Sequence, residues 1–129
     1  MDNMKLELME LLFVEARKAS EKPPESIDSR IDMQNVVLDK TNLVVDFVYS
    51  ATYATDGTYI RMGGRAFFSG PEAKTASDEW KKNKRINGKI GEEIINTINY
   101  SSSLNSVLVA PVLNIMPPLA PPKIVLEKK

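Results

Sequence analysis

The sequence predicts an α+β fold in which an antiparallel sheet is covered on one face by a helix. Residues 42–70 form two alternating segments that meet at Asp56-Gly57, a dipeptide typical of β-hairpin turns. Residues 90–98 instead place Ile90, Ile94, Ile95 and Ile98 on one side of a helix. A sheet with one apolar face needs such a cover, so the two segments belong to one core.

The chain of 129 residues suits a single domain. Its content of 43% hydrophobic and 26% charged residues is ordinary for a soluble globular protein. We expect the sheet within residues 4–70, a polar connection at 71–88, the covering helix at 89–100, and an extended, proline-rich tail at 107–129.

Charge and composition exclude several classes of function. Lys plus Arg equals Asp plus Glu, 17 each, so no net charge attracts nucleic acid. The chain has no Cys and no His, which removes the common nucleophile–base pairs and the usual metal sites. We therefore expect no enzyme activity, no cofactor and no metal. Acidic residues at 2, 7 and 10 do not fit a secretory signal, and no apolar run suggests membrane insertion, so the expected location is cytoplasmic.

The hairpin register can be predicted if Asp56 and Gly57 are the central residues of a type I′ turn. One face of the hairpin is then entirely apolar or small. Its predicted pairs are Tyr53 with Ile60, Ala51 with Met62, Tyr49 with Gly64, Phe47 with Ala66 and Val45 with Phe68. The other face carries Arg61 and Arg65 and tolerates water.

The segments before the hairpin are less distinct. Residues 4–19 fit either a helix, from their Leu, Met, Glu and Ala content, or a strand, from the alternation at Leu6 and Leu8. Residues 29–38 alternate apolar and polar side chains and predict a half-buried strand. The residues alone thus predict at least three strands, and four if the N-terminal stretch joins them.

The connection at 72–89 is polar except for Trp80, which could anchor a short helix over 77–84. Its basic cluster, Lys81, Lys82, Lys84, Arg85 and Lys89, reads as a solvated loop, with an RNA contact as the weaker alternative. Five of the eight prolines lie between Pro111 and Pro122, and proline excludes both a helix interior and a central strand. The apolar tail therefore packs on its own domain or on a partner, or it lines an apolar groove.

Two strings carry a family resemblance. They are MGGRAFFSG at 62–70, a paired glycine before an apolar strand end, and GEEIINTINYSSSLNSVLVAPVLN at 91–114, a helix followed by a polar break and an Ala-Pro-Val-x-Asn string. In this order they resemble the SecB family of export chaperones and its SecB-like relatives. The resemblance implies that residues 6–16 are a strand, which gives a four-stranded antiparallel meander sheet.

The resemblance also implies a function, namely ATP-independent binding of unfolded or partly folded polypeptides in apolar grooves of a homo-dimer or homo-tetramer. The candidate polypeptide-binding residues are Met33, Tyr59, Val109, Val112, Leu113, Ile115, Met116 and Leu119. The alternative is an interaction module whose proline-rich tail binds one specific partner.

The chain departs from the family in two places. Prolines at 117, 118, 121 and 122 forbid the second helix that follows the Ala-Pro-Val-x-Asn string in the bacterial chaperone. Arg61 and Arg65 stand where an acidic sheet surface would dock a translocation motor. A SecB-like relative with another partner is therefore expected rather than the chaperone of protein transport itself.

Overall fold

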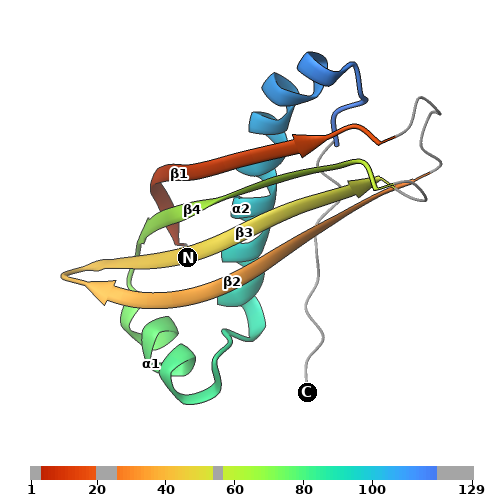
Figure 1. The fold of residues 1–129 in the computed structure, drawn as a ribbon. Coiled ribbons are helices and arrows are strands. Elements are labelled where there is room, and N and C mark those ends of the chain that lie inside the picture. The colour runs from red at the N-terminus through yellow and green to blue at the C-terminus, as the bar shows by residue number, and fades with distance from the viewer. Residues whose placement is uncertain (1–3, 20–25, 54–56, 119–129) are drawn as a thin grey trace.

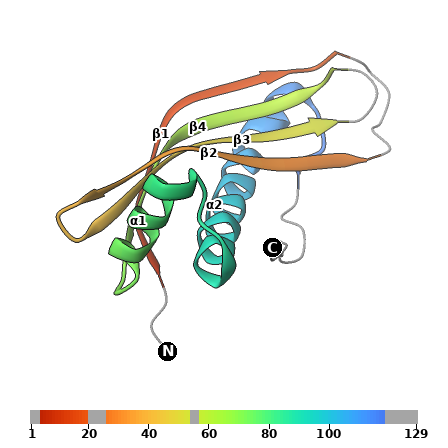
Figure 2. The same cartoon turned by 90° about the horizontal axis from the view of Figure 1, so that it is seen from below.

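The computed structural model describes residues 4–19, 26–53 and 57–118. Four strands form one sheet, namely β1 (Lys5–Arg17), β2 (Ile27–Asp39), β3 (Asn42–Tyr53) and β4 (Tyr59–Ser69). Two helices, α1 (Ala73–Asn83) and α2 (Gly88–Val109), are followed by a short 3₁₀ turn, η1 (Ala110–Leu113). Figure 2 shows both helices on the same side of the sheet, so the predicted α+β class with one covered face is confirmed.

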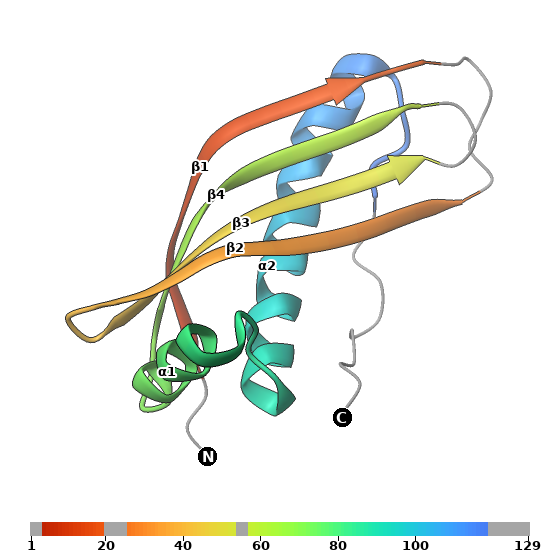
Figure 3. The ribbon, with the colours of Figure 1, turned by 60° about the horizontal axis from the view of Figure 1, so that its bottom comes forward.

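The strand order is β1-β4-β3-β2, and every neighbouring pair is antiparallel. A strict four-stranded meander would place β1 beside β2, and this part of the prediction needs correction. Only β2, β3 and β4 form a meander, while β1 lies against β4 in a Greek-key arrangement (Figure 1). Consequently β1 and β2 are the two edges of the sheet (Figure 3).

The predicted hairpin register is wrong by two residues. Val45 lies opposite Ala66, Phe47 opposite Gly64 and Tyr49 opposite Met62. The Tyr53 N–H donates to the Thr58 carbonyl over 2.9 Å. Four residues therefore lie between the two strands' last paired residues, whereas the predicted turn had only Asp56 and Gly57 between them. Because strand side chains alternate with a period of two, the shift leaves every residue on its predicted face.

The inner face of the sheet is the core. Its central strands alternate between buried and partly exposed side chains along their length, as expected for a sheet with one covered side. The fully buried large side chains of this face are Leu43, Val45, Phe47, Tyr49, Tyr53, Ile60, Met62 and Phe68. Ile94 and Ile98 of α2 and Trp80 of α1 complete the same core, and Ile90 packs against it, which confirms their predicted roles. Ile95, predicted on the same face, is partly exposed and does not belong to this core.

Helix α2 is longer than the sequence predicts. It continues through the polar stretch at 101–105 to Val109, and η1 follows directly, so residues 107–113, expected in an extended tail, are helical. The reason is that Ser102, Ser103 and Ser106 are buried, and packing outweighs the weak helix propensity of serine. Pro111 is accommodated in the first turn of η1, and Asn114, with φ of 55°, ends it.

Candidate functional site

The predicted polypeptide-binding residues occupy three different parts of the molecule. Met33 is half-buried and packs on the core from β2, whereas Tyr59 begins β4 on the opposite, helix-free face. The others gather at the C-terminal end of α2 and just beyond it: Val109, Val112, Leu113, Ile115 and Met116. Leu119 lies outside the described residues. The structure thus brings five of these residues together and separates Met33 and Tyr59 from them.

An exposed apolar stripe runs along α2 into η1. Its members recur at intervals of three to four residues, the spacing of one helix face, and we call them the α2 stripe: Tyr100, Leu104, Val107, Leu108 and Val112. Leu108 is 76% exposed and Val112 78% exposed. Met116, 60% exposed, follows four residues beyond Val112. An exposed apolar helix face of this kind marks an interaction site.

The buried side of the same helix is unusually polar. Asn99, Ser102, Ser103 and Ser106 all lie on the buried face of α2 and are at most 3% exposed. Ser106 Oγ donates to the Ser102 carbonyl over 3.0 Å. The Oγ atoms of Ser102 and Ser103 and the Oδ1 atom of Asn99 have no hydrogen-bond partner in the described part of the chain. These short side chains allow the helix to lie close to the sheet, at the cost of unsatisfied polar atoms.

Beyond η1 the chain is held against the end of the sheet. The Ile115 N–H donates to the Ala110 carbonyl over 3.1 Å, and the Tyr53 hydroxyl donates to the Met116 carbonyl. Burial, with a smaller contribution from Tyr49, raises the pKa of Tyr53 to about 12. Pro118 is fully buried as well. Residues 115–118 therefore form an anchored strap across the Tyr53 end of β3.

The helix-free face of the sheet carries alternating apolar and charged rows, each crossing all four strands. One row consists of Leu8, Phe67, Val44 and Val37. The next consists of Glu10, Arg65, Asp46 and Asn35, and the third of Phe13, Gly63, Val48 and Asp32. The charged side chains pair within the face, with Arg65 Nε 3.3 Å from Asp46 Oδ1 and Arg61 Nη1 2.9 Å from Glu15 Oε1.

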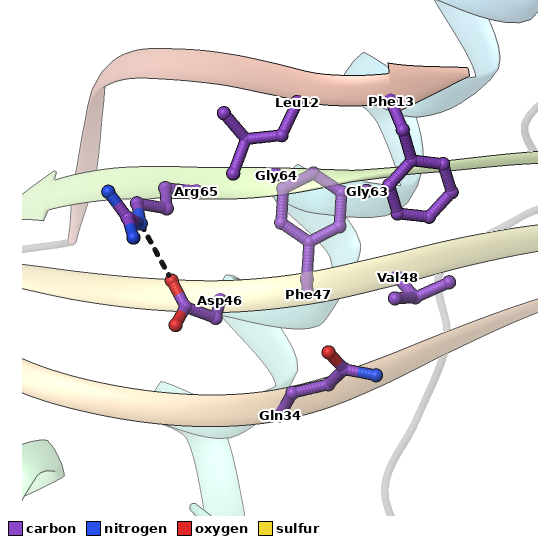
Figure 4. A pocket seen from close by; sticks show the side chains of 9 residues that line it. All are labelled: Leu12, Phe13, Gln34, Asp46, Phe47, Val48, Gly63, Gly64 and Arg65. Atoms are coloured by element: carbon purple, nitrogen blue, oxygen red, sulfur yellow. Dashed lines mark hydrogen bonds and ion pairs between the residues drawn. The ribbon is translucent and has the colours of Figure 1, made fainter.

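A shallow hollow of about 170 Å³ opens on this face above the paired glycines. Figure 4 shows Leu12 and Phe13 of β1 above Gly64 and Gly63, with the Arg65–Asp46 ion pair at one end of the hollow and Val48 at the other. The Arg61 guanidinium lies 5.8 Å from the centre of the Phe13 ring. The hollow is apolar with locally neutralised charges, so it suits an apolar side chain rather than an anion.

Sequence reasoning missed these rows because they depend on three irregularities in the edge strands. Register shifts occur between Leu6 and Leu8 and between Leu11 and Phe13 in β1, and between Met33 and Asn35 in β2. Each inserts a residue that breaks the simple alternation of the strand. Only the pairing with β3 and β4 shows which side chains then share a face.

Two other features bear on the alternatives. The basic side chains at 81, 82, 84, 85 and 89 are exposed, but Trp80 is 6% exposed and packs in the core. Its indole is therefore not available to stack on a nucleic-acid base.

In the described ranges, no group of three acidic side chains is placed to hold a metal ion. Neither described helix is long and apolar enough to cross a membrane.

Comparison with known proteins supports the fold. No family model matches the chain. A search of curated proteins also found no match. Among solved structures, the chain is similar to the SecB-like chaperone Rv1957 of Mycobacterium tuberculosis, solved in complex with a ChAD peptide from the HigA1 antitoxin Rv1956. The TM-score is 0.51 at 12% identity, over 98% of this chain and 90% of that chain.

At this identity the likeness is one of fold. The chain has an α+β fold like that of a SecB-like chaperone, as the two sequence strings predicted.

Proposed function

We propose that this protein is a chaperone-like protein that binds non-native polypeptides without ATP and without catalysis. The observation that carries the proposal is the α2 stripe, and Met116, beyond the end of η1, is a further exposed apolar side chain. The structural neighbour, which binds an antitoxin peptide, supports polypeptide binding as the kind of activity that suits this fold. The expected cytosolic location remains a prediction.

Within this surface we assign two roles. Tyr100, Leu104 and Leu108 lie on the helical part of the stripe, where a second copy could pack helix against helix in a homo-dimer or homo-tetramer. Val112 and Met116 lie beyond the helix, next to the half-buried Leu113 and Ile115. We assign this end to the client polypeptide.

The direct test is light scattering coupled to size exclusion, with and without a permanently unfolded polypeptide and with no nucleotide. Co-elution of the two chains is expected, together with suppressed aggregation of an unfolding client near stoichiometric amounts. The paired change Val112→Asp and Met116→Asp should abolish co-elution. Val37→Asp is the matched control, because Val37 is an exposed apolar residue on the opposite face. No binding to any unfolded chain would reject the proposal.

The alternative is an interaction module with one partner, bound by the proline-rich segment after residue 118. The anchoring of residues 115–118 favours it, because a fixed strap would present the following segment from a constant position. On this alternative, a chain ending at Pro118 would lose one specific partner in a pull-down and still bind unfolded polypeptides unchanged. On the main proposal, client binding depends on residues 112 and 116.

A further inference from the structure

The methionines of the described residues differ sharply in exposure. Met62 is fully buried and Met4 is 8% exposed, while Met9 and Met33 are partly buried and pack against the core. Among these described methionines, Met116 alone is an exposed side chain, at 60%. An oxidant can attack a thioether only where it reaches the sulfur, so the fold protects the other four and leaves Met116 open to reaction.

The main chain that carries Met116 is held by groups other than its side chain. The Met116 carbonyl accepts a hydrogen bond from the buried Tyr53 hydroxyl, and the Ile115 N–H donates to the Ala110 carbonyl. Pro118, two residues further on, is fully buried. The strap therefore presents the Met116 thioether to solvent from a fixed backbone. A polar oxygen on this sulfur would be hydrated in the free protein, so we expect oxidation to leave the fold intact.

Oxidation of the Met116 thioether requires a peroxide, and the chain has no cysteine that would compete for it. The sulfur attacks one oxygen of hydrogen peroxide, and the O–O bond breaks as the S–O bond forms. The proton of the transferred hydroxyl group passes to the departing hydroxide, which leaves as water. The sulfur is oxidised and the peroxide is reduced by the same electron pair. The product is a polar sulfoxide, which a methionine sulfoxide reductase returns to the thioether with electrons from a dithiol.

We propose that Met116 is a site of reversible sulfoxidation by peroxide, and that the sulfoxide weakens the binding of client polypeptide. The effect on binding rests on the proposed function, in which Val112 and Met116 hold the client, whereas the site of oxidation does not. The sulfoxide removes the apolar contribution of one side chain from the client surface. The affinity for an unfolded polypeptide should therefore fall about tenfold, without loss of stability.

The site can be tested in the full-length protein by brief treatment with hydrogen peroxide, tryptic digestion and mass spectrometry. The peptide with Met116 should gain an oxygen well before the peptides with Met9, Met33 and Met62. Treatment in denaturant is the control, because unfolding exposes every sulfur and should remove the difference. Urea denaturation should give the same midpoint before and after selective oxidation. Equal oxidation of the four methionines in the folded protein would overturn the site.

The effect on binding is measured by titrating a labelled, methionine-free unfolded polypeptide after catalase has removed the peroxide. Met116→Leu keeps an apolar side chain without a thioether, so this variant should bind the polypeptide and keep its affinity after treatment. Met9→Leu is the matched control and should lose affinity as the wild type does. Methionine sulfoxide reductase with dithiothreitol should restore the affinity of the wild type.

The two parts of the proposal fail in different ways. If the wild type keeps its affinity after Met116 is fully oxidised, or if Met116→Leu loses as much affinity as the wild type, the effect on binding is wrong. If the untreated protein binds no unfolded polypeptide, the proposed function fails and the effect on binding fails with it. Selective oxidation of Met116, read from the peptide masses, would still stand in that case.

Discussion

The ring of Phe13 on β1 covers the backbone of Gly63 on β4. A Cβ atom at position 63 would lie 2.8 Å from Phe13 Cζ and 3.1 Å from the Phe47 carbonyl oxygen. At the neighbouring Gly64, a Cβ atom would meet the β1 backbone instead, 2.9 Å from Leu11 Cα. Here the irregularity between Leu11 and Phe13 brings β1 over the paired glycines. The two glycines therefore tolerate substitution differently.

Gly63→Ala should lower the free energy of unfolding by about 1–3 kcal/mol, because the added methyl group displaces the Phe13 ring. The ring is a side chain and can be removed. In the double variant with Phe13→Ala, the loss should be smaller than the sum of the two single losses, as measured by urea denaturation. Strict additivity of the two changes would show that the ring does not rest on Gly63.

Gly64→Ala should destabilise the protein more than Gly63→Ala, since the obstacle is main chain that no single side-chain deletion removes. Adding Phe13→Ala should leave this loss unrelieved. The same urea titrations measure it. Relief by Phe13→Ala to the extent seen at position 63 would contradict the assigned contact.

Ser102→Ala and Ser103→Ala should each stabilise the protein. Alanine exceeds serine in helix propensity by about 0.5 kcal/mol. A buried hydroxyl without a partner costs about 1–3 kcal/mol more. Ser106→Ala is the control, since it has the same gain in propensity but loses the bond to the Ser102 carbonyl. Thermal melts should give both variants a higher melting temperature than Ser106→Ala. An equal rise in the melting temperature of all three variants would show that helix propensity alone causes the effect.

Stability should fall as the pH rises from about 10 toward 12 because of Tyr53. Its pKa is about 12 in the folded protein against an ordinary value of 10.0, so the folded state keeps its proton over a range in which the unfolded state loses it. The contribution is fully present below pH 10 and is lost as the pH rises through the folded value. Tyr53→Phe should flatten this part of the pH–stability curve. Tyr59→Phe, at a partly exposed site on the helix-free face, serves as the control.

Leu104→Asp and Leu108→Asp should reduce the molar mass measured by light scattering to that of a monomer. A charge placed in a helix–helix contact loses its hydration, so the associated state becomes less stable than the free chain. Leu8→Asp changes an exposed leucine, 56% exposed, on the helix-free face and should leave the mass unchanged. If the wild-type protein itself has the molar mass of a monomer, the proposed self-association is wrong.

Much of this fold could be predicted because local patterns and tertiary packing agree. The alternation of residues 42–70 identified the buried face, and the isoleucine spacing identified the helix that covers it. The register could not be obtained from Asp56-Gly57, because long-range contacts compete with the turn preference. Thr58, at the head of β4, accepts a hydrogen bond at Oγ1 from the Ala19 N–H over 2.9 Å, which ties the hairpin to the segment after β1.

The candidate site was predicted less well. The end of α2 could not be located because serine breaks helices in isolation but is tolerated where a helix lies close to a sheet. Because the helix was predicted to end at residue 100, Leu104, Val107 and Leu108 were not expected on a helix, and the α2 stripe was not predicted. Their spacing of three to four residues was the available signal.

The strand order also sets a sequence of events during synthesis. Among the described residues β1 pairs with β4 alone, so the backbone of Lys5 has a partner only after Ser69, at the C-terminal end of β4, has been synthesised. The hairpins β2–β3 and β3–β4 are local and can close first, whereas β1 makes the long-range contacts that are slow to form. Until β4 leaves the ribosome, the apolar side chains of β1 are exposed in a nascent chain. A protein with the proposed affinity for unfolded polypeptides would, at that stage, resemble one of its own clients.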